Sequence, residues 1–144
     1  ADSKRKPYDS AQETSSDYDI SHNMSLTASY NLTDAINVGF TYRISTGKPY
    51  TPVTSATYDP VQDVYVPVYA LKNSDRFPTY TRLDMSFQYL TSLFNKFCVV
   101  VVAFNNVLNT KNLYQYSYNF DYSNKIEINS LNKRIVYFGV GLQL

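Results

Sequence analysis

Residues 18–31 alternate between two kinds of side chain, and this alternation constrains the fold more than any other feature of the chain. Every second position from 20 to 30 carries a mostly apolar set: Ile20, His22, Met24, Leu26, Ala28 and Tyr30. The positions between them carry only Ser, Thr or Asn. A period of two predicts a β-strand with unlike faces. Ordinary strands run about 5–6 residues, so a longer one with small polar residues on one side favours a wall between lipid and a watery lumen.

The same pattern returns along the chain and predicts five long strands. Residues 36–44 and 82–89 alternate as clearly as the first segment. In residues 97–104 both faces are apolar, which is costly against water but not against protein that fills a lumen. The last segment places Val136, Phe138, Val140, Leu142 and the terminal Leu144 on one face. The predicted strands are Tyr18–Asn31, Ala35–Thr46, Thr79–Leu90, Phe97–Leu108 and Arg134–Leu144.

The connections between these strands alternate in length. Short turns are expected at Leu32–Asp34 and Thr91–Lys96, and long polar segments at Gly47–Pro78 and Asn109–Lys133. Outer-membrane barrels have short periplasmic turns and longer extracellular loops. The pattern therefore predicts extracellular long loops and a periplasmic C-terminus. A soluble antiparallel meander with two decorated loops is the alternative.

Composition limits the function. Thirteen Lys and Arg against twelve Asp and Glu leave a net charge of +1, so there is no basic stripe for nucleic acid. Cys98 cannot form an internal disulfide, and we expect it and His22 to serve packing rather than nucleophilic, metal or base roles. The acidic loop residues are too dispersed for a calcium loop. We expect no enzyme activity, no cofactor and no metal site.

Two groups of residues are candidates for contact with a ligand or with other protein. Alternate polar positions on two of the predicted strands would face the lumen, where Arg82 and Asp84 can pair with each other or with Arg43. This group is Arg43, Arg82, Asp84 and Gln88. Loop tyrosines offer a flat apolar face with a hydroxyl, which suits siderophores, glycans or peptides equally. The candidates are Tyr50, Tyr65, Tyr69, Tyr116 and Tyr118.

Several short motifs together resemble the C-terminal part of TonB-dependent outer-membrane receptors, particularly those of Bacteroidetes. The most specific is Arg-Phe-Pro-Thr-Tyr-Thr-Arg-Leu-Asp at residues 76–84. It is preceded by Thr-Gly-Lys-Pro-Tyr-Thr-Pro at 46–52 and followed by Asn-Asn-Val-Leu-Asn at 105–109 and Tyr-Phe-Gly-Val at 137–140. The resemblance covers roughly residues 18–144. The family usually ends on an aromatic residue, whereas this chain ends on Leu144.

The resemblance implies five C-terminal strands of a plugged, 22-stranded transmembrane β-barrel that imports a scarce nutrient with TonB-coupled energy. Residues 18–144 would be the barrel strands, and residues 1–17 the remnant of an extracellular loop. The expected partners are outer-membrane lipid, the remaining strands and plug of the same receptor, the TonB complex through an N-terminal part, and a small nutrient ligand. The start at Ala1 fits a processed or excised piece. A non-transporting adhesin or scaffold barrel, and a soluble β-rich glycan-binding module, are the alternatives.

Overall fold

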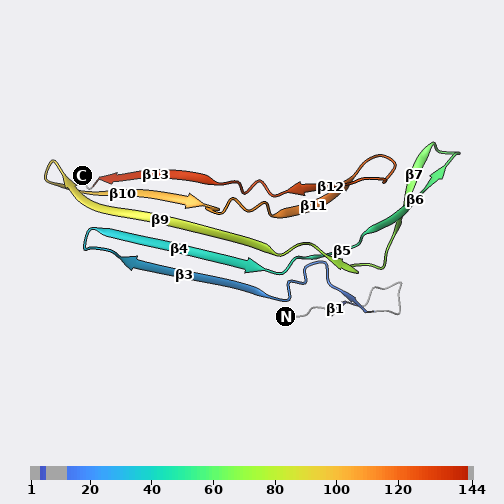
Figure 1. Ribbon diagram of the computed structural model, residues 1–144, viewed down its shortest axis with the longest axis horizontal. Coiled ribbons are helices and arrows are strands. Elements are labelled where there is room, and N and C mark those ends of the chain that lie inside the picture. Colours follow the sequence, from blue (N-terminus) through green and yellow to red (C-terminus); the bar gives the residue numbers. More distant parts are fainter. Residues whose placement is uncertain (1–3, 6–12, 143–144) are drawn as a thin grey trace. The chain divides into compact units, whose positions relative to one another are not determined.

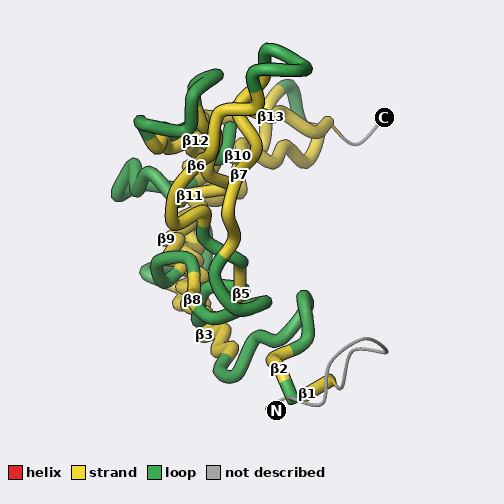
Figure 2. The backbone as a smooth tube through the Cα atoms, turned by 90° about the vertical axis from the view of Figure 1, so that its right-hand side faces the viewer, coloured by secondary structure: helices red, strands yellow, loops and turns green. Residues whose placement is uncertain are grey.

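The computed structural model describes residues 4–5 and 13–142, and β-strands are the only regular secondary structure in that part of the chain. Figure 2 shows these strands joined by loops, and the sheets are antiparallel. The predicted all-β class is therefore confirmed at that level. The chain divides into two compact units, which we name the sheet unit (24–44, 81–111 and 131–144) and the hairpin unit (1–23, 45–80 and 112–130). No helix among the described residues is long and apolar enough to cross a membrane.

Five long strands lie side by side in the open sheet of the sheet unit (Figure 1). Their spatial order is β13 (Ile135–Leu142), β10 (Lys96–Asn105), β9 (Tyr80–Leu93), β4 (Ile36–Ser45) and β3 (Asn23–Asn31). They correspond to the five segments predicted from alternation. The turns between β3 and β4 and between β9 and β10 are short, whereas the connections from β4 to β9 and from β10 to β13 are long.

The register separates a polar face from an apolar face, as the alternation predicts. The hydroxyl oxygens of Thr27 on β3 and Thr41 on β4 are 3.2 Å apart, and the guanidinium of Arg43 on β4 donates a hydrogen bond to the carboxylate of Asp84 on β9. We call the side that carries these residues the polar face. The opposite, apolar face holds cross-strand rows such as Phe87, Val102 and Phe138. Large side chains on this face are exposed, among them Leu26, Phe40, Phe87, Phe138 and Val140.

The polar character of the polar face is lost over β10 and β13. Gln88 pairs with Val101, which pairs in turn with Gly139, and Ser86 pairs with Ala103 in the same way. Aliphatic side chains and glycine, together with Tyr137 as the partner of Ala103, therefore continue the face that begins with Thr, Asn and Ser on β3 and β4. Among the described residues, Cys98 is the only buried hydrophobic side chain, at 3% exposure. The sheet unit thus has no apolar core of its own in that part of the chain.

Three strand boundaries differ from the prediction by three residues or more, and one of them is the end of β10, which lies at Asn105 rather than Leu108. The first strand begins at Asn23, because Tyr18 lies in a turn and Asp19 turns back through a hydrogen bond from its amide to the Ser16 carbonyl. The second short turn is tighter than the predicted Thr91–Lys96 segment. Strand β9 continues to Leu93, and only Phe94 and Asn95 make the turn, with φ of 51° and 61°. Two successive positive φ values match the type I′ hairpin turn.

The described part of the hairpin unit contains four strand pairs, and three of them lie within the two long connections. The four pairs are β1 (Lys4–Arg5) with β2 (Thr14–Ser15), β5 (Pro49–Tyr50) with β8 (Asp75–Arg76), β6 (Val53–Asp59) with β7 (Val64–Tyr69), and β11 (Leu113–Tyr118) with β12 (Lys125–Asn129). The terminal residue Leu144, which the alternation places on the apolar face, lies outside the described residues.

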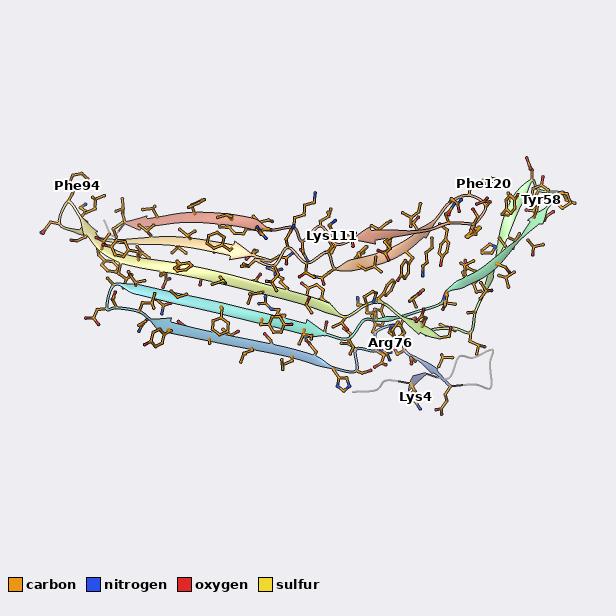
Figure 3. The ribbon with its side chains drawn as sticks, in the orientation of Figure 1. Lys4, Tyr58, Arg76, Phe94, Lys111 and Phe120 are labelled. Atoms are coloured by element: carbon orange, nitrogen blue, oxygen red, sulfur yellow. The ribbon has the colours of Figure 1, made fainter. Side chains whose placement is uncertain are left out.

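A close backbone approach holds the β5–β8 pair together. A Cβ atom at Gly47 would lie 1.7 Å from the carbonyl oxygen of Phe77, so only glycine fits there. The amide of Phe77 donates to the carbonyl of Lys48 at 2.9 Å. Arg76, labelled in Figure 3, pairs with the buried carboxylate of Asp19 and also donates to the carbonyl of Gly47 at 3.2 Å. The Thr-Gly-Lys-Pro-Tyr and Arg-Phe-Pro motifs are therefore in direct contact with each other.

Candidate functional site

Three aromatic rings from separate parts of the hairpin unit stack on one another. The ring centroids of Tyr50 and Phe77 are 4.7 Å apart, and those of Phe77 and Tyr116 are 5.3 Å apart, with interplanar angles of 27° and 25°. Tyr50 and Tyr116 complete the group at 5.0 Å. All three side chains are only half-buried. We call these three residues the aromatic cluster; offset stacking of this kind adds about 0.5–1.5 kcal/mol per pair beyond area burial.

Charged side chains border the aromatic cluster. The ammonium of Lys125, at the start of β12, lies 4.0 Å from the centroid of the Tyr116 ring and 5.8 Å from that of Tyr50. The same ammonium lies 3.5 Å from the Tyr50 hydroxyl, which donates to Asp75 at 2.8 Å. Lys125 thus contacts the rings of Tyr50 and Tyr116, and Tyr50 links it to the carboxylate of Asp75.

These contacts shift the ionisation of two groups in opposite directions. Burial, together with the hydrogen bond to Asp75, raises the pKa of Tyr50 above its ordinary value. The hydrogen bond from Tyr50 is the main reason that the pKa of Asp75 is lowered, with the Arg76 amide and the Lys125 charge adding to it. At neutral pH the site therefore combines a neutral phenol, a carboxylate and an ammonium beside stacked rings.

The predicted loop tyrosines lie in four separate places in the hairpin unit. Tyr50 and Tyr116 belong to the aromatic cluster. Tyr65 contacts Tyr58 at 5.2 Å and the edge of Phe120 at 5.2 Å, so it belongs to a separate group on the β6–β7 hairpin. Tyr118 lies 5.8 Å from Tyr122, and its hydroxyl accepts from the Val53 amide at 3.5 Å. Tyr69 is 60% exposed at the end of β7.

The four polar residues predicted to face a lumen share the polar face of the sheet unit. Asp84 receives hydrogen bonds from Arg43 and Arg82, both at 2.6 Å. It also accepts the backbone amide of Asn106 at 2.9 Å, which fixes the corner that follows β10. Gln88 lies four residues after Asp84 on β9. It borders a hollow of about 400 Å³ over the small side chains of the polar face. The predicted pairing of Arg43, Arg82 and Asp84 is thus present.

Sequence reasoning missed three participants. Phe77 lies inside the Arg-Phe-Pro motif, and its aromatic character was the available signal. Asp75 and Lys125 carry no local signal, because what brings them to the rings is the pairing of β5 with β8 and of β11 with β12. In the described part of the chain, no three His, Cys, Asp or Glu side chains come together as a metal site.

Comparison of the chain with protein-family models, with curated proteins and with solved structures found no match.

Proposed function

We propose that the chain is the C-terminal barrel portion of a TonB-dependent outer-membrane receptor. In this proposal the sheet unit is part of the barrel wall, and the hairpin unit is the extracellular part that meets the nutrient. The receptor imports a scarce siderophore, glycan or peptide, and its upstream plug and TonB-contacting segment couple import to energy from the inner membrane.

The observation that carries the proposal is a five-stranded sheet that exposes large apolar side chains on one face. Phe138 is 80% exposed and Val140 is 69% exposed. Soluble domains cover such a face with a second layer, since contiguous apolar patches beyond a few hundred Å² are rare on monomers. Lipid covers it in a barrel wall without any second layer. The two edge strands, β3 and β13, each pair on one side only in the described sheet, and in lipid they require further strands.

The polar face supports the same proposal. The carboxylate of Asp84 pairs with both Arg43 and Arg82 there, and charged groups inside a membrane protein are generally paired. The aliphatic strip of Val101 and Gly139 would contact protein in the lumen rather than water. The motifs that resemble the receptor family also make specific contacts: Gly47 packs on Phe77, and Asn106 donates its amide to Asp84.

Cysteine labelling on whole cells tests the membrane orientation. Cysteine placed at Ser74 or Ser123, both exposed in the long connections, should react with an impermeant maleimide. Cysteine at Asp34, in the short turn after β3, should not react until the cells are permeabilised. The buried Cys98 serves as the internal background control. Labelling of Asp34 alone would reverse the orientation and refute the assignment of the long segments to the outside.

Two other functions fit parts of the chain. A non-transporting adhesin or scaffold barrel would have the same wall, so the presence of a plug domain upstream decides for import. A soluble glycan-binding module would use the same tyrosine groups on the hairpin unit. The exposed apolar face argues against the soluble module, and light scattering of the isolated chain without detergent separates that module from either barrel.

A further inference from the structure

The Lys125 ammonium occupies a position that a ligand cation could take. Aromatic faces attract cations through the ring quadrupole, and groups of aromatic rings are the usual means by which proteins bind quaternary ammonium ligands. Here the cation lies 4.0 Å from the centroid of Tyr116 and also approaches Tyr50. The Asp75 carboxylate accepts a hydrogen bond from the same Tyr50 hydroxyl that the Lys125 ammonium approaches, so it supplies negative charge near the cation. The rings, the carboxylate and the bound cation together form a complete cation site.

Lys125 is suited to being displaced. Its side chain is exposed, and among the described residues no carboxylate lies within 4.0 Å of its ammonium. Tyr50, Phe77 and Tyr116, by contrast, are half-buried and hold one another in place. Departure of Lys125 into water therefore leaves the three rings stacked. A ligand can bind only while Lys125 is away from the rings. The apparent affinity for the ligand is therefore the intrinsic affinity multiplied by the fraction of time that the site is open.

The geometry points to the aromatic cluster as a binding site for an organic cation, a quaternary ammonium or amine group, with Lys125 as its internal competitor. This inference deepens the proposed function, because it names the chemical class of the nutrient that the hairpin unit recognises. The binding site itself does not depend on the membrane location of the sheet unit.

Choline is the probe, and the full chain is studied in a non-ionic maltoside micelle, because zwitterionic detergents carry the same ammonium group. Ligand-observed NMR of the choline methyl protons measures the dissociation constant. Lys125→Gln removes the charge and shortens the side chain by only one atom, so it should bind choline about fivefold more tightly than the wild type, which corresponds to about 1 kcal/mol. Lys72→Gln, at an exposed lysine of the same unit, should leave the constant unchanged.

Two further measurements isolate the ring and the charge. Tyr116→Leu, placed in the Lys125→Gln background, keeps apolar bulk but loses the aromatic face and should abolish binding. The neutral isostere of choline, in which carbon replaces nitrogen, should bind at least about tenfold more weakly than choline to Lys125→Gln, since only the cation gains from the rings and Asp75. The circular dichroism spectrum of each variant must match that of the wild type. Tyr116→Phe, which keeps the aromatic face, is the control that should still bind choline.

Equal affinity of wild type and Lys125→Gln, equal binding of the neutral isostere, or full binding by Tyr116→Leu would each overturn the inference. If choline binds as expected while whole-cell labelling contradicts the proposed orientation, the cation site stands and the receptor function falls. If labelling succeeds and choline binding fails, the receptor proposal stands and the nutrient is of another class.

Discussion

Replacement of Asn106 should destabilise the sheet unit more than any other single polar substitution in the Asn-Asn-Val-Leu-Asn motif. Asn106 is 1% exposed, and its side chain makes three hydrogen bonds to backbone: it donates to the carbonyls of Thr110 and Asn132 and accepts the amide of Thr110. Each such bond contributes about 0.5–1.5 kcal/mol. Asn106→Gly should therefore lower the free energy of unfolding by about 1.5–4.5 kcal/mol.

The backbone conformation of Asn106 should also make the alanine and glycine substitutions at this position differ in stability. Its φ is 51°, in the left-handed region, which costs a residue with a Cβ atom about 1–2 kcal/mol. Asn106→Ala should consequently be less stable than Asn106→Gly, the reverse of the usual order in a regular strand. Thermal and urea unfolding of the full chain in maltoside micelles, followed by circular dichroism, measures both differences.

Asn95→Gly is the matched control for this pair. Asn95 also has positive φ, 61°, but it lies exposed in the turn after β9, so glycine should leave stability almost unchanged there. The reasoning is refuted if Asn106→Gly unfolds like the wild type, because the three side-chain bonds would then contribute nothing. It is equally refuted if Asn106→Ala is as stable as Asn106→Gly.

Three further substitutions test the faces of the sheet, the phenol of Tyr50 and the backbone contact at Gly47. Phe87→Arg should cost about 2–4 kcal/mol in lipid vesicles if position 87 lies near the bilayer midplane, whereas Ser86→Arg on the polar face should cost clearly less; equal losses would contradict the assignment of faces. Because the pKa of Tyr50 is raised, its stabilising contribution is present below about pH 10 and is lost as pH rises toward the native pKa. The pKa of Tyr58 is also raised, by its hydrogen bond to Asp63, so an alkaline absorbance titration should end in a late step to which both tyrosines contribute. Tyr50→Phe should reduce that late step, and an unchanged titration curve would refute the shift. Gly47→Ala places a Cβ atom 1.7 Å from the Phe77 carbonyl and should open the β5–β8 pair to proteolysis. Gly39→Ala meets only the rotatable Ser86 hydroxyl, at 2.8 Å, and should be milder, so equal protease resistance of the two variants would count against the close approach.

The alternation of apolar and polar residues was enough to locate all five long strands, because each strand has two unlike faces and period-two patterning records them directly. Strand ends were less predictable. Phe94 carries no turn signal, yet it adopts positive φ beside Asn95, since the tight pairing of β9 with β10 leaves only two residues for the turn. Tyr18 continues the alternation in sequence, but the chain turns at that residue.

The hairpins in the long segments were missed because several of their strands carry a weak or contrary sequence signal. Strand β7 contains Pro67, which argues against a strand interior, and β5 and β8 have two residues each. The site was predictable only in part for the same reason. Tyr50 and Tyr116 were recognisable as aromatic residues in exposed segments, but nothing local in the sequence pairs them with each other or with Lys125.

Light scattering of the isolated chain in detergent-free buffer tests the central claim, that the apolar face of the sheet unit belongs against lipid. Within the described part of the sheet unit, no second layer covers the row that contains Phe87, Val102 and Phe138. The chain should therefore aggregate in this buffer, and it should become monodisperse when a non-ionic detergent is added. A compact, cooperatively melting monomer of 16.5 kDa without detergent would contradict the barrel-wall account and would favour a soluble binding module instead.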